Sequence, residues 1–338
     1  MEKIKILSDK KAVELWLKGK DAWNEWVLAN PKYSIDFRSV DFSGHNRISF
    51  KQFHFPDGDV SFSHVQFGKG DVSFRGAKFG EGVVDFQQVS TAGSMFFINT
   101  QFGEGLYSFE YAVFGGNVMF TRMGNTQKIK QFSLRYATFH KALAIDAPKG
   151  FNCVVDLVST NLSCHLDMHN FTCTLQENEG YPMRVAKDKK DIGRLQRLKE
   201  LAQKNLAHEQ AIDYKIEEMQ ARRIHEHDNL FKLIVEYLFW AFSNYGRSII
   251  LPLSWLFGST LVAVLYTVEW SLKKANLWQV GECLFARGLP ITGNSRILLN
   301  SSECDLIAWS APIPTVYSFL CLLWVFLIGL ELRNRFRL

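Results

Sequence analysis

The sequence predicts a mixed fold in three parts: an N-terminal repeat domain, a charged helical linker and a C-terminal pair of membrane-spanning helices. Three observations support it. Phenylalanine recurs at regular steps between residues 50 and 120, a strongly charged segment follows after residue 183, and two long apolar runs lie near the C-terminus. The opening Met1–Lys5 has no apolar signal-peptide core, so we expect the first 240 residues to stay on the side of synthesis.

The repeat domain is predicted from residues 32 to 178. Its phenylalanines alternate between steps of seven and five residues in two runs, which gives a twelve-residue period. The first run is Phe55, Phe62, Phe67, Phe74, Phe79 and Phe86, and the second is Phe102, Phe109 and Phe114. A fixed period indicates one structural unit stacked on itself, because no single copy can bury its aromatic face alone. We therefore expect a solenoid with a column of rings as its core.

Small or β-branched residues stand two positions before most of these rings, as Val60 does before Phe62. Positions two apart share one face of a strand, so both would point inward. Residues 1–31 are predicted to form a helical cap, in which the indoles of Trp23 and Trp26 cover the open end of the solenoid.

The steps Phe37 to Phe42, Phe62 to Phe67 and Phe74 to Phe79 resemble the pentapeptide-repeat family, which has a large apolar residue every five positions. The resemblance implies a right-handed quadrilateral β-helix. This chain departs from a strict repeat by two extra residues in every second face, supplied as Gly-x-Gly at Gly68/Gly70, Gly80/Gly82 and Gly103/Gly105. We expect these glycines to form bulged corners through their free φ angle.

Residues 183–246 are predicted to form a charged amphipathic helical linker, ending in an interfacial helix near residues 229–242. The transmembrane module occupies residues 247–338, with spans at 248–268 and 313–330. Helices of these lengths measure about 31 and 27 Å, close to a bilayer core of about 30 Å. A segment at 277–296 is too short to cross and is predicted to be re-entrant.

This module looks like the ion-channel-like C-terminus of some membrane-bound pentapeptide-repeat proteins. The residues that carry the likeness include Tyr245-Gly246-Arg247-Ser248, Leu289-Pro290 with Gly293, and the ending Leu332 to Arg337. The resemblance implies a homo-oligomeric inner-membrane pore, with four subunits by analogy with potassium channels. The potassium filter signature Thr-Val-Gly-Tyr-Gly is absent, so potassium selectivity is not implied.

Polar residues between the spans are the candidate pore site. A constriction is predicted at Thr292, Gly293, Asn294 and Ser295, since carbonyls and hydroxyls can replace part of an ion's hydration shell. An acidic vestibule is predicted at Glu282, Glu303 and Asp305. The alternatives are an ordinary polar turn and solvated loop charges. Cys283 and Cys304 are candidates for a disulfide, with two free thiols as the alternative.

A basic run in the linker is a candidate site for an anionic nucleotide or oligonucleotide: Lys187, Lys189, Lys190, Arg194, Arg197 and Lys204. Repeated around a symmetric oligomer, it would form a positive ring. The alternative is a solvated helix face, because Asp188, Asp191 and Glu200 interrupt the run. No catalytic signature, metal site or cofactor motif is recognised, so an enzyme is not expected.

Flanking charge predicts the orientation. Seven basic residues flank the outer ends of the two spans and four lie between the spans: Arg222, Arg223, Lys232, Arg247, Arg333, Arg335 and Arg337 against Lys273, Lys274, Arg287 and Arg296. This excess favours cytoplasmic N- and C-termini in a bacterial inner membrane.

The sequence is compatible with two functions. The first is a homo-oligomeric ion channel whose cytoplasmic repeat domain senses a signal or a protein partner, by analogy an effector of stress or antiviral defence. The second is a non-conducting, membrane-anchored scaffold that binds other proteins through the repeat surface.

Overall fold

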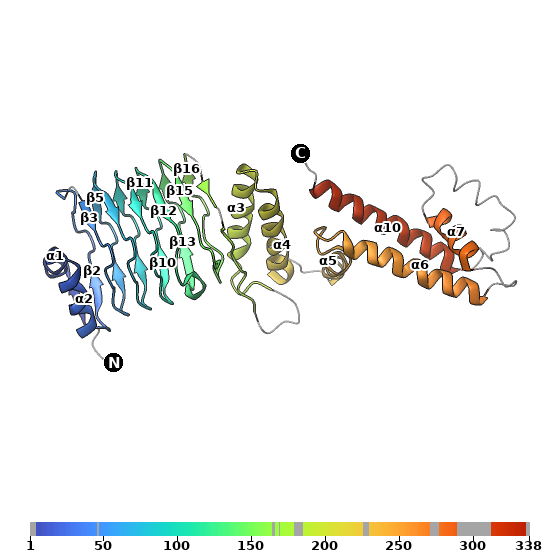
Figure 1. The fold of residues 1–338 in the computed structure, drawn as a ribbon, viewed down its shortest axis with the longest axis horizontal. Coiled ribbons are helices and arrows are strands. Elements are labelled where there is room, and N and C mark those ends of the chain that lie inside the picture. Colours follow the sequence, from blue (N-terminus) through green and yellow to red (C-terminus); the bar gives the residue numbers. More distant parts are fainter. Residues whose placement is uncertain are drawn as a thin grey trace. The chain divides into compact units, whose positions relative to one another are not determined.

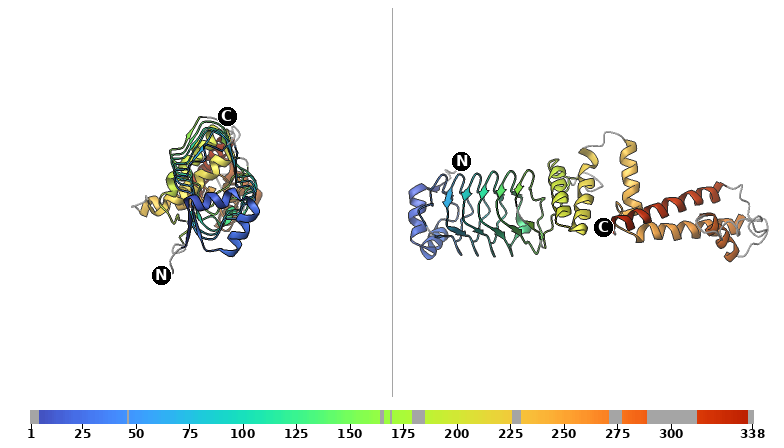
Figure 2. Two further views of the ribbon diagram at one scale, coloured as in Figure 1. Left: turned by 90° about the vertical axis from the view of Figure 1, so that its left-hand side faces the viewer. Right: turned by 90° about the horizontal axis from the view of Figure 1, so that it is seen from above.

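The computed structural model describes residues 5–45, 47–163, 166–168, 170–178, 185–225, 230–270, 277–288 and 312–335. The chain forms two compact units, Met1–Glu226 and His227–Leu338. Figures 1 and 2 show the elements of each unit in chain order.

The N-terminal end of the first unit is covered by a short strand, β1 (Ile6–Ser8), and two helices, α1 (Asp9–Leu17) and α2 (Lys20–Ala29). Trp16 and Trp23 are buried against the first phenylalanines of the sheets, and Trp23 stacks on Phe37 with ring centroids 6.0 Å apart. The Trp23 indole also donates a hydrogen bond to the His54 carbonyl oxygen at 2.7 Å. Trp26 is half buried, packs against the same core and contacts Tyr33.

The strands of the first unit form three sheets, and every strand pair is parallel. The first sheet contains, in spatial order, β1, β2 (Ser34–Asp36), β4 (Val60–Ser61), β7 (Val84–Asp85), β10 (Leu106–Ser108) and β13 (Gln131–Ser133). The second contains β16 (Asn161–Leu162), β14 (Thr138–Phe139), β11 (Val113–Phe114), β8 (Ser90–Thr91) and β5 (Gln66–Gly68). The third contains β17 (Leu166–Asp167), β15 (Leu143–Ile145), β12 (Val118–Phe120), β9 (Met95–Phe96), β6 (Asp71–Ser73) and β3 (Arg47–Ser49).

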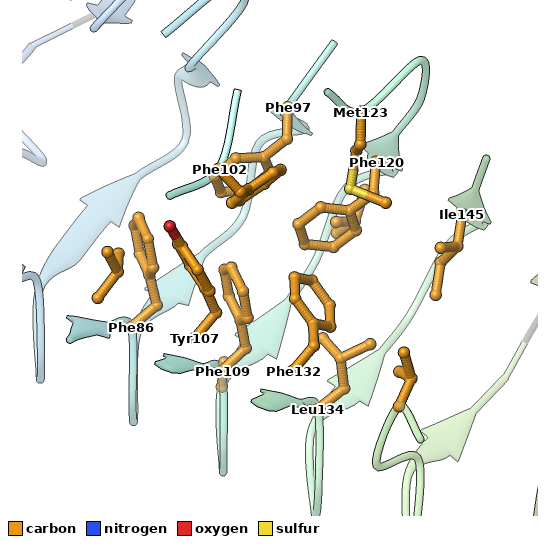
Figure 3. Close-up of a cluster of buried hydrophobic side chains, with 14 of the residues drawn as sticks. Phe86, Phe97, Phe102, Tyr107, Phe109, Phe120, Met123, Phe132, Leu134 and Ile145 are labelled. Atoms are coloured by element: carbon orange, nitrogen blue, oxygen red, sulfur yellow. The ribbon is translucent and has the colours of Figure 1, made fainter. Parts of the chain in front are cut away.

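The three sheets enclose one aromatic core. In the first sheet Val60 pairs with Val84, and Val84 with Tyr107, so the phenylalanines two residues further on are brought into register. Phe62 and Phe86 stack with centroids 4.7 Å apart, and Phe86 and Phe109 with centroids 4.9 Å apart. Figure 3 shows Phe86 and Phe109 projecting into the core beside Tyr107 and Phe132, and Phe132 pairs in register with Tyr107. The predicted column of rings is therefore the core of this unit.

The predicted right-handed quadrilateral β-helix is wrong. The described strands form three parallel sheets and do not close into a four-sided coil; together with the eight described α-helices they make an α/β fold. Where a fourth face was expected, His54, Lys78, Gln101 and Gly124 form only isolated bridges. Pro56 lies in this region and lacks an N–H to donate, and glycines such as Gly80 weaken strands, so no continuous sheet forms there.

The expected bulged corner is found at Gly68, which has a φ angle of 70° and lies at a register shift of β5. The sites at Gly80/Gly82 and Gly103/Gly105 serve a different purpose. Gly80, Gly82, Gly103 and Gly105 do not have positive φ angles. Instead, a Cβ atom at Gly82 would overlap the carbonyl group of Gly58, and one at Gly105 the carbonyl oxygen of Gly82. These glycines permit close approach between neighbouring backbone segments.

The C-terminal end of the first unit is a helical hairpin, α3 (Asp191–Lys204) and α4 (His208–His225). Leu195, Leu198 and Ala202 of α3 are buried in the same core as the sheet residues. A short 3-10 helix, Thr126–Lys128, lies earlier, before β13. The sheets are thus covered by helices at both ends (Figure 1).

The second unit is helical in its described part: α5 (Leu230–Ser243), α6 (Ile250–Trp270), α7 (Leu277–Gly288) and α10 (Pro312–Arg335). Its buried residues form a separate core.

Candidate membrane-spanning site

Two helices of the second unit are long and apolar enough to cross a bilayer. The qualifying windows are Ile250–Glu269 of α6 and Val316–Arg333 of α10, with mean hydropathies of 1.6 and 1.8. Only 22% and 28% of these windows are buried within the chain, whereas the core helix of a soluble protein would be mostly covered. Large apolar side chains such as Phe257 and Phe319 instead point away from the chain.

The two helices contact each other through small and polar groups. The Thr260 hydroxyl and the Tyr317 hydroxyl are hydrogen-bonded at 3.0 Å, and Ala263, Val264 and Cys321 are buried around them. In hydrocarbon a polar side chain is stable only when it is paired, so this contact places both hydroxyls inside the hairpin.

A second contact between the two helices is made by aromatic rings. Trp255 of α6 stacks on Trp324 of α10, with centroids 6.0 Å apart and an interplanar angle of 18°. Phe242 of α5 meets Trp324 edge to face at 4.9 Å. The end of α5 is thereby packed on both long helices.

The short helix α7 packs on both α6 and α10. Val280, Cys283 and Leu284 of α7 are buried in one cluster with residues of the two long helices. Trp278 lies on the exposed side of α7 and donates a hydrogen bond to Glu282 Oε1 at 2.8 Å. Glu282, the first predicted vestibule residue, is exposed.

The other residues of the predicted pore lie outside the described part of the chain. Thr292, Gly293, Asn294 and Ser295 of the predicted constriction, and Glu303 and Asp305 of the vestibule, lie outside the described residues. The segment 277–296 is described only over α7. Cys283 is disulfide-bonded, but Cys304 also lies outside the described residues, so their pairing stays a prediction.

The six basic residues predicted to bind an anion do not form one surface. Lys187, Lys189 and Lys190 are exposed just before α3, and Lys204 is exposed at its other end. Since α3 has 14 residues, about 20 Å separates the two groups. Arg197 pairs with Glu200 and donates to the Thr160 carbonyl oxygen, so part of its charge is already compensated.

Arg194 is buried in an ion-pair cluster that the sequence interpretation missed. Its guanidinium donates to Asp191 at 2.7 Å, to Asp188 at 3.0 Å and to Asp156 at 3.1 Å. Asp156 lies 38 residues earlier in the chain, and its backbone forms an isolated β-bridge with Ser133 of β13 in the first sheet. The cluster therefore attaches α3 to the sheets. The only sequence signal was the Asp-x-x-Arg spacing of Asp191 and Arg194, which is compatible with a helical ion pair.

The cluster contains more negative than positive charge. Burial raises the pKa of Asp191, and the hydrogen bond from Arg194 opposes that shift. Burial lowers the pKa of Arg194, but the hydrogen bonds to Asp191 and Asp156 outweigh it and leave the pKa raised. Arg194 is thus a charged structural anchor and is not available to an outside anion.

Comparisons of the chain with protein-family models, with curated proteins and with solved structures found no match.

Proposed function

We propose that this protein is a homo-oligomeric, channel-like protein of the bacterial inner membrane, with both termini in the cytoplasm. The observation that carries the proposal is the α6–α10 hairpin, which directs most of its apolar surface outward and packs with the short helix α7. A span, a short helix and a second span is the arrangement of two-helix pore modules. The proposal does not extend to the identity of the ion.

Small residues on the outward surface support self-association. Ser254 and Gly258 are exposed and lie one turn apart on α6, and Gly329 is exposed on α10. No atom lies within 4 Å of a Cβ built at Gly258 or Gly329. Small residues at such positions let backbones of neighbouring helices approach closely in a bilayer. A second copy of the hairpin fits this surface, and the proposed assembly is a tetramer.

The first unit is proposed to be the sensor. Lys187, Lys189 and Lys190 form a compact exposed basic group before α3, suited to an anionic nucleotide or oligonucleotide. In this proposal ligand binding opens the pore and depolarises the cell, as an effector of stress or antiviral defence would.

Planar-bilayer recording of the purified oligomer tests conduction. The unsubstituted chain and Gly44→Trp should give unitary currents, because Gly44 lies in the first unit with no atom near its Cβ position. Gly293→Trp should abolish these currents by filling the predicted constriction, while the subunit count by light scattering stays unchanged. Silence of every preparation would contradict conduction.

A membrane-anchored scaffold is the second candidate, favoured by one surface feature. Tyr111 and Tyr136 are both exposed and stack on each other at 4.9 Å, and the Arg135 guanidinium lies over the Tyr136 ring at 5.1 Å. Exposed tyrosine and arginine are typical of protein-binding surfaces. A protein partner that is lost on Tyr111→Ser together with Tyr136→Ser, in the absence of any current, would support this function.

A further inference from the structure

Helix α5 exposes an unusual amount of apolar surface. Six large apolar side chains of this 14-residue helix are between 39% and 70% exposed: Phe231, Ile234, Val235, Tyr237, Leu238 and Trp240. Phe242, near its end, is the residue that packs on Trp255 and Trp324. Most of the helix is therefore covered by no described part of the chain, and in water it would be poorly soluble.

Two polar side chains of α5, Glu236 and Ser243, are buried. The Glu236 carboxylate is buried and accepts a hydrogen bond from the Tyr245 hydroxyl at 3.0 Å. The Ser243 hydroxyl donates to the Phe239 carbonyl oxygen at 2.8 Å. Lys232 is the exposed charged residue of the helix, and its long stem can reach an aqueous boundary from an apolar surface.

A tight turn fixes the direction of α5 relative to α6. Asn244, Tyr245 and Gly246 all have left-handed backbone conformations, with φ angles of 47°, 58° and 77°. The Ser243 carbonyl oxygen accepts hydrogen bonds from the next three available amides, those of Gly246, Arg247 and Ser248, at 3.0 to 3.2 Å. In Figure 1, α5 is seen end-on, whereas α6 and α10 are seen along their length. The right-hand view of Figure 2 shows α5 running crosswise to the hairpin.

We propose that α5 lies in the plane of the membrane surface, with its exposed rings at the boundary between phospholipid headgroups and acyl chains. The proposal rests on insertion of the α6–α10 hairpin, because a helix that crosses the hairpin axis lies parallel to the bilayer when the hairpin spans it. At about 21 Å, α5 is shorter than the bilayer core of about 30 Å and is unsuited to spanning.

Phospholipid is the occupant that fits this surface, because the surface continues directly from the hairpin. Tyr237 and Trp240 lie side by side with ring centroids 5.6 Å apart, and such amphipathic rings concentrate at headgroup level. The exposed Lys232 adds positive charge to this surface, which favours anionic headgroups.

Spin labels attached to single introduced cysteines test the position of α5. Labels at Phe231, Val235 and Leu238 would be placed in the full-length protein in vesicles of phosphatidylethanolamine and phosphatidylglycerol. Their depths would be measured from collisions with oxygen and with a water-soluble nickel complex. Lys204→Cys is the aqueous reference, Val262→Cys the buried-span reference, and the unsubstituted chain gives the background from native thiols.

The expected result is three equal, shallow depths for the α5 labels, with Val262 deep and Lys204 in water. If α5 instead ran along the bilayer normal, labels at Phe231 and Leu238 would differ in depth by about 10 Å. Either that difference or aqueous exposure of all three labels would overturn the proposal. A deep Val262 label in the same vesicles would show that hairpin insertion had nevertheless succeeded, so the two proposals fail separately.

Bromine quenching of native tryptophan fluorescence gives a second measurement, independent of labelling. Trp240→Phe should remove more of the quenching by lipids brominated near the headgroup than of the quenching by lipids brominated near the bilayer centre. An equal loss with both lipids, or no loss with either, would overturn the in-plane position.

Discussion

Arg194 decides how the helical end of the first unit is attached. Its guanidinium joins two residues of the α3 region, Asp188 and Asp191, to Asp156 beside the first sheet. A buried charge that loses its partner is strongly unfavourable, so this residue is more sensitive than the exposed basic residues around it.

Arg194→Met should destabilise the first unit by about 3–5 kcal/mol, because Asp156 and Asp191 would be left buried without their cation. Urea unfolding of the full-length protein in detergent measures the loss, and hydrogen exchange locates it in α3. Arg197→Met is the matched control on the same helix. Its pair with Glu200 is partly exposed, so a loss of about 1 kcal/mol or less is expected. Equal losses for the two variants would contradict the anchoring role.

Asp191 should make the stability of the first unit depend on pH. Burial raises its folded-state pKa above the ordinary value of 3.8, so the folded chain holds this proton more tightly than the unfolded chain. The stabilisation is complete below pH 3.8 and is lost as the pH rises through the raised folded-state pKa.

Asp191→Asn keeps an oxygen that can accept from Arg194 but removes the charge. Its urea midpoint should therefore fall less steeply than that of the unsubstituted chain as the pH rises through this window. Asp188→Asn, at a half-exposed position, is the control and should keep most of the original slope. An unchanged slope in Asp191→Asn would show that the carboxylate does not cause it.

The elements of the first unit follow closely from the phenylalanine period. Phe62, Phe86 and Phe109 have the inward direction that the spacing predicts, and alternation along a strand is a local property that sequence reveals well. The number of sheets could not be predicted from the phenylalanine spacing. It depends on backbone hydrogen bonds between segments about 24 residues apart, and Pro56 and the neighbouring glycines leave only bridges at the expected fourth face.

Gly82→Ala should destabilise the first unit by about 1–3 kcal/mol, because the new methyl group would overlap the Gly58 carbonyl and the backbone would have to shift. Gly44→Ala is the control, since no atom lies within 4 Å of its Cβ position, and a change within about 0.5 kcal/mol is expected. Urea unfolding of the two variants makes the comparison. Similar stabilities would contradict the close-approach explanation.

At the scale of the whole molecule, the two long helices determine how the chain meets a membrane. Their outward apolar surface and their short partner α7 support insertion as a hairpin. A chain that crosses a bilayer twice returns to the face from which it started, so the first unit and the end of α10 should lie on one side.

Cysteine labelling in intact and lysed bacterial spheroplasts tests this topology. Asn300→Cys should react with a membrane-impermeant maleimide in intact spheroplasts, whereas Lys204→Cys and Arg333→Cys should react only after lysis, because their flanking charge favours the cytoplasm. The unsubstituted chain controls for native thiols. Reaction of Lys204→Cys in intact spheroplasts would show that the orientation is opposite to the predicted one. Equal reaction of Asn300→Cys and Lys204→Cys would contradict insertion as a hairpin.

The sequence by itself determined the local properties: the inward phenylalanines, the helical ends and the two apolar helices. These depend on spacing and composition within short windows. Only the tertiary structure decided that the strands form three parallel sheets, that Gly82 is required for close backbone approach, and that Arg194 is an internal anchor rather than a ligand-binding residue. Each of these depends on groups distant in the chain, because hydrogen bonds, steric overlap and ion pairs form between neighbours in space.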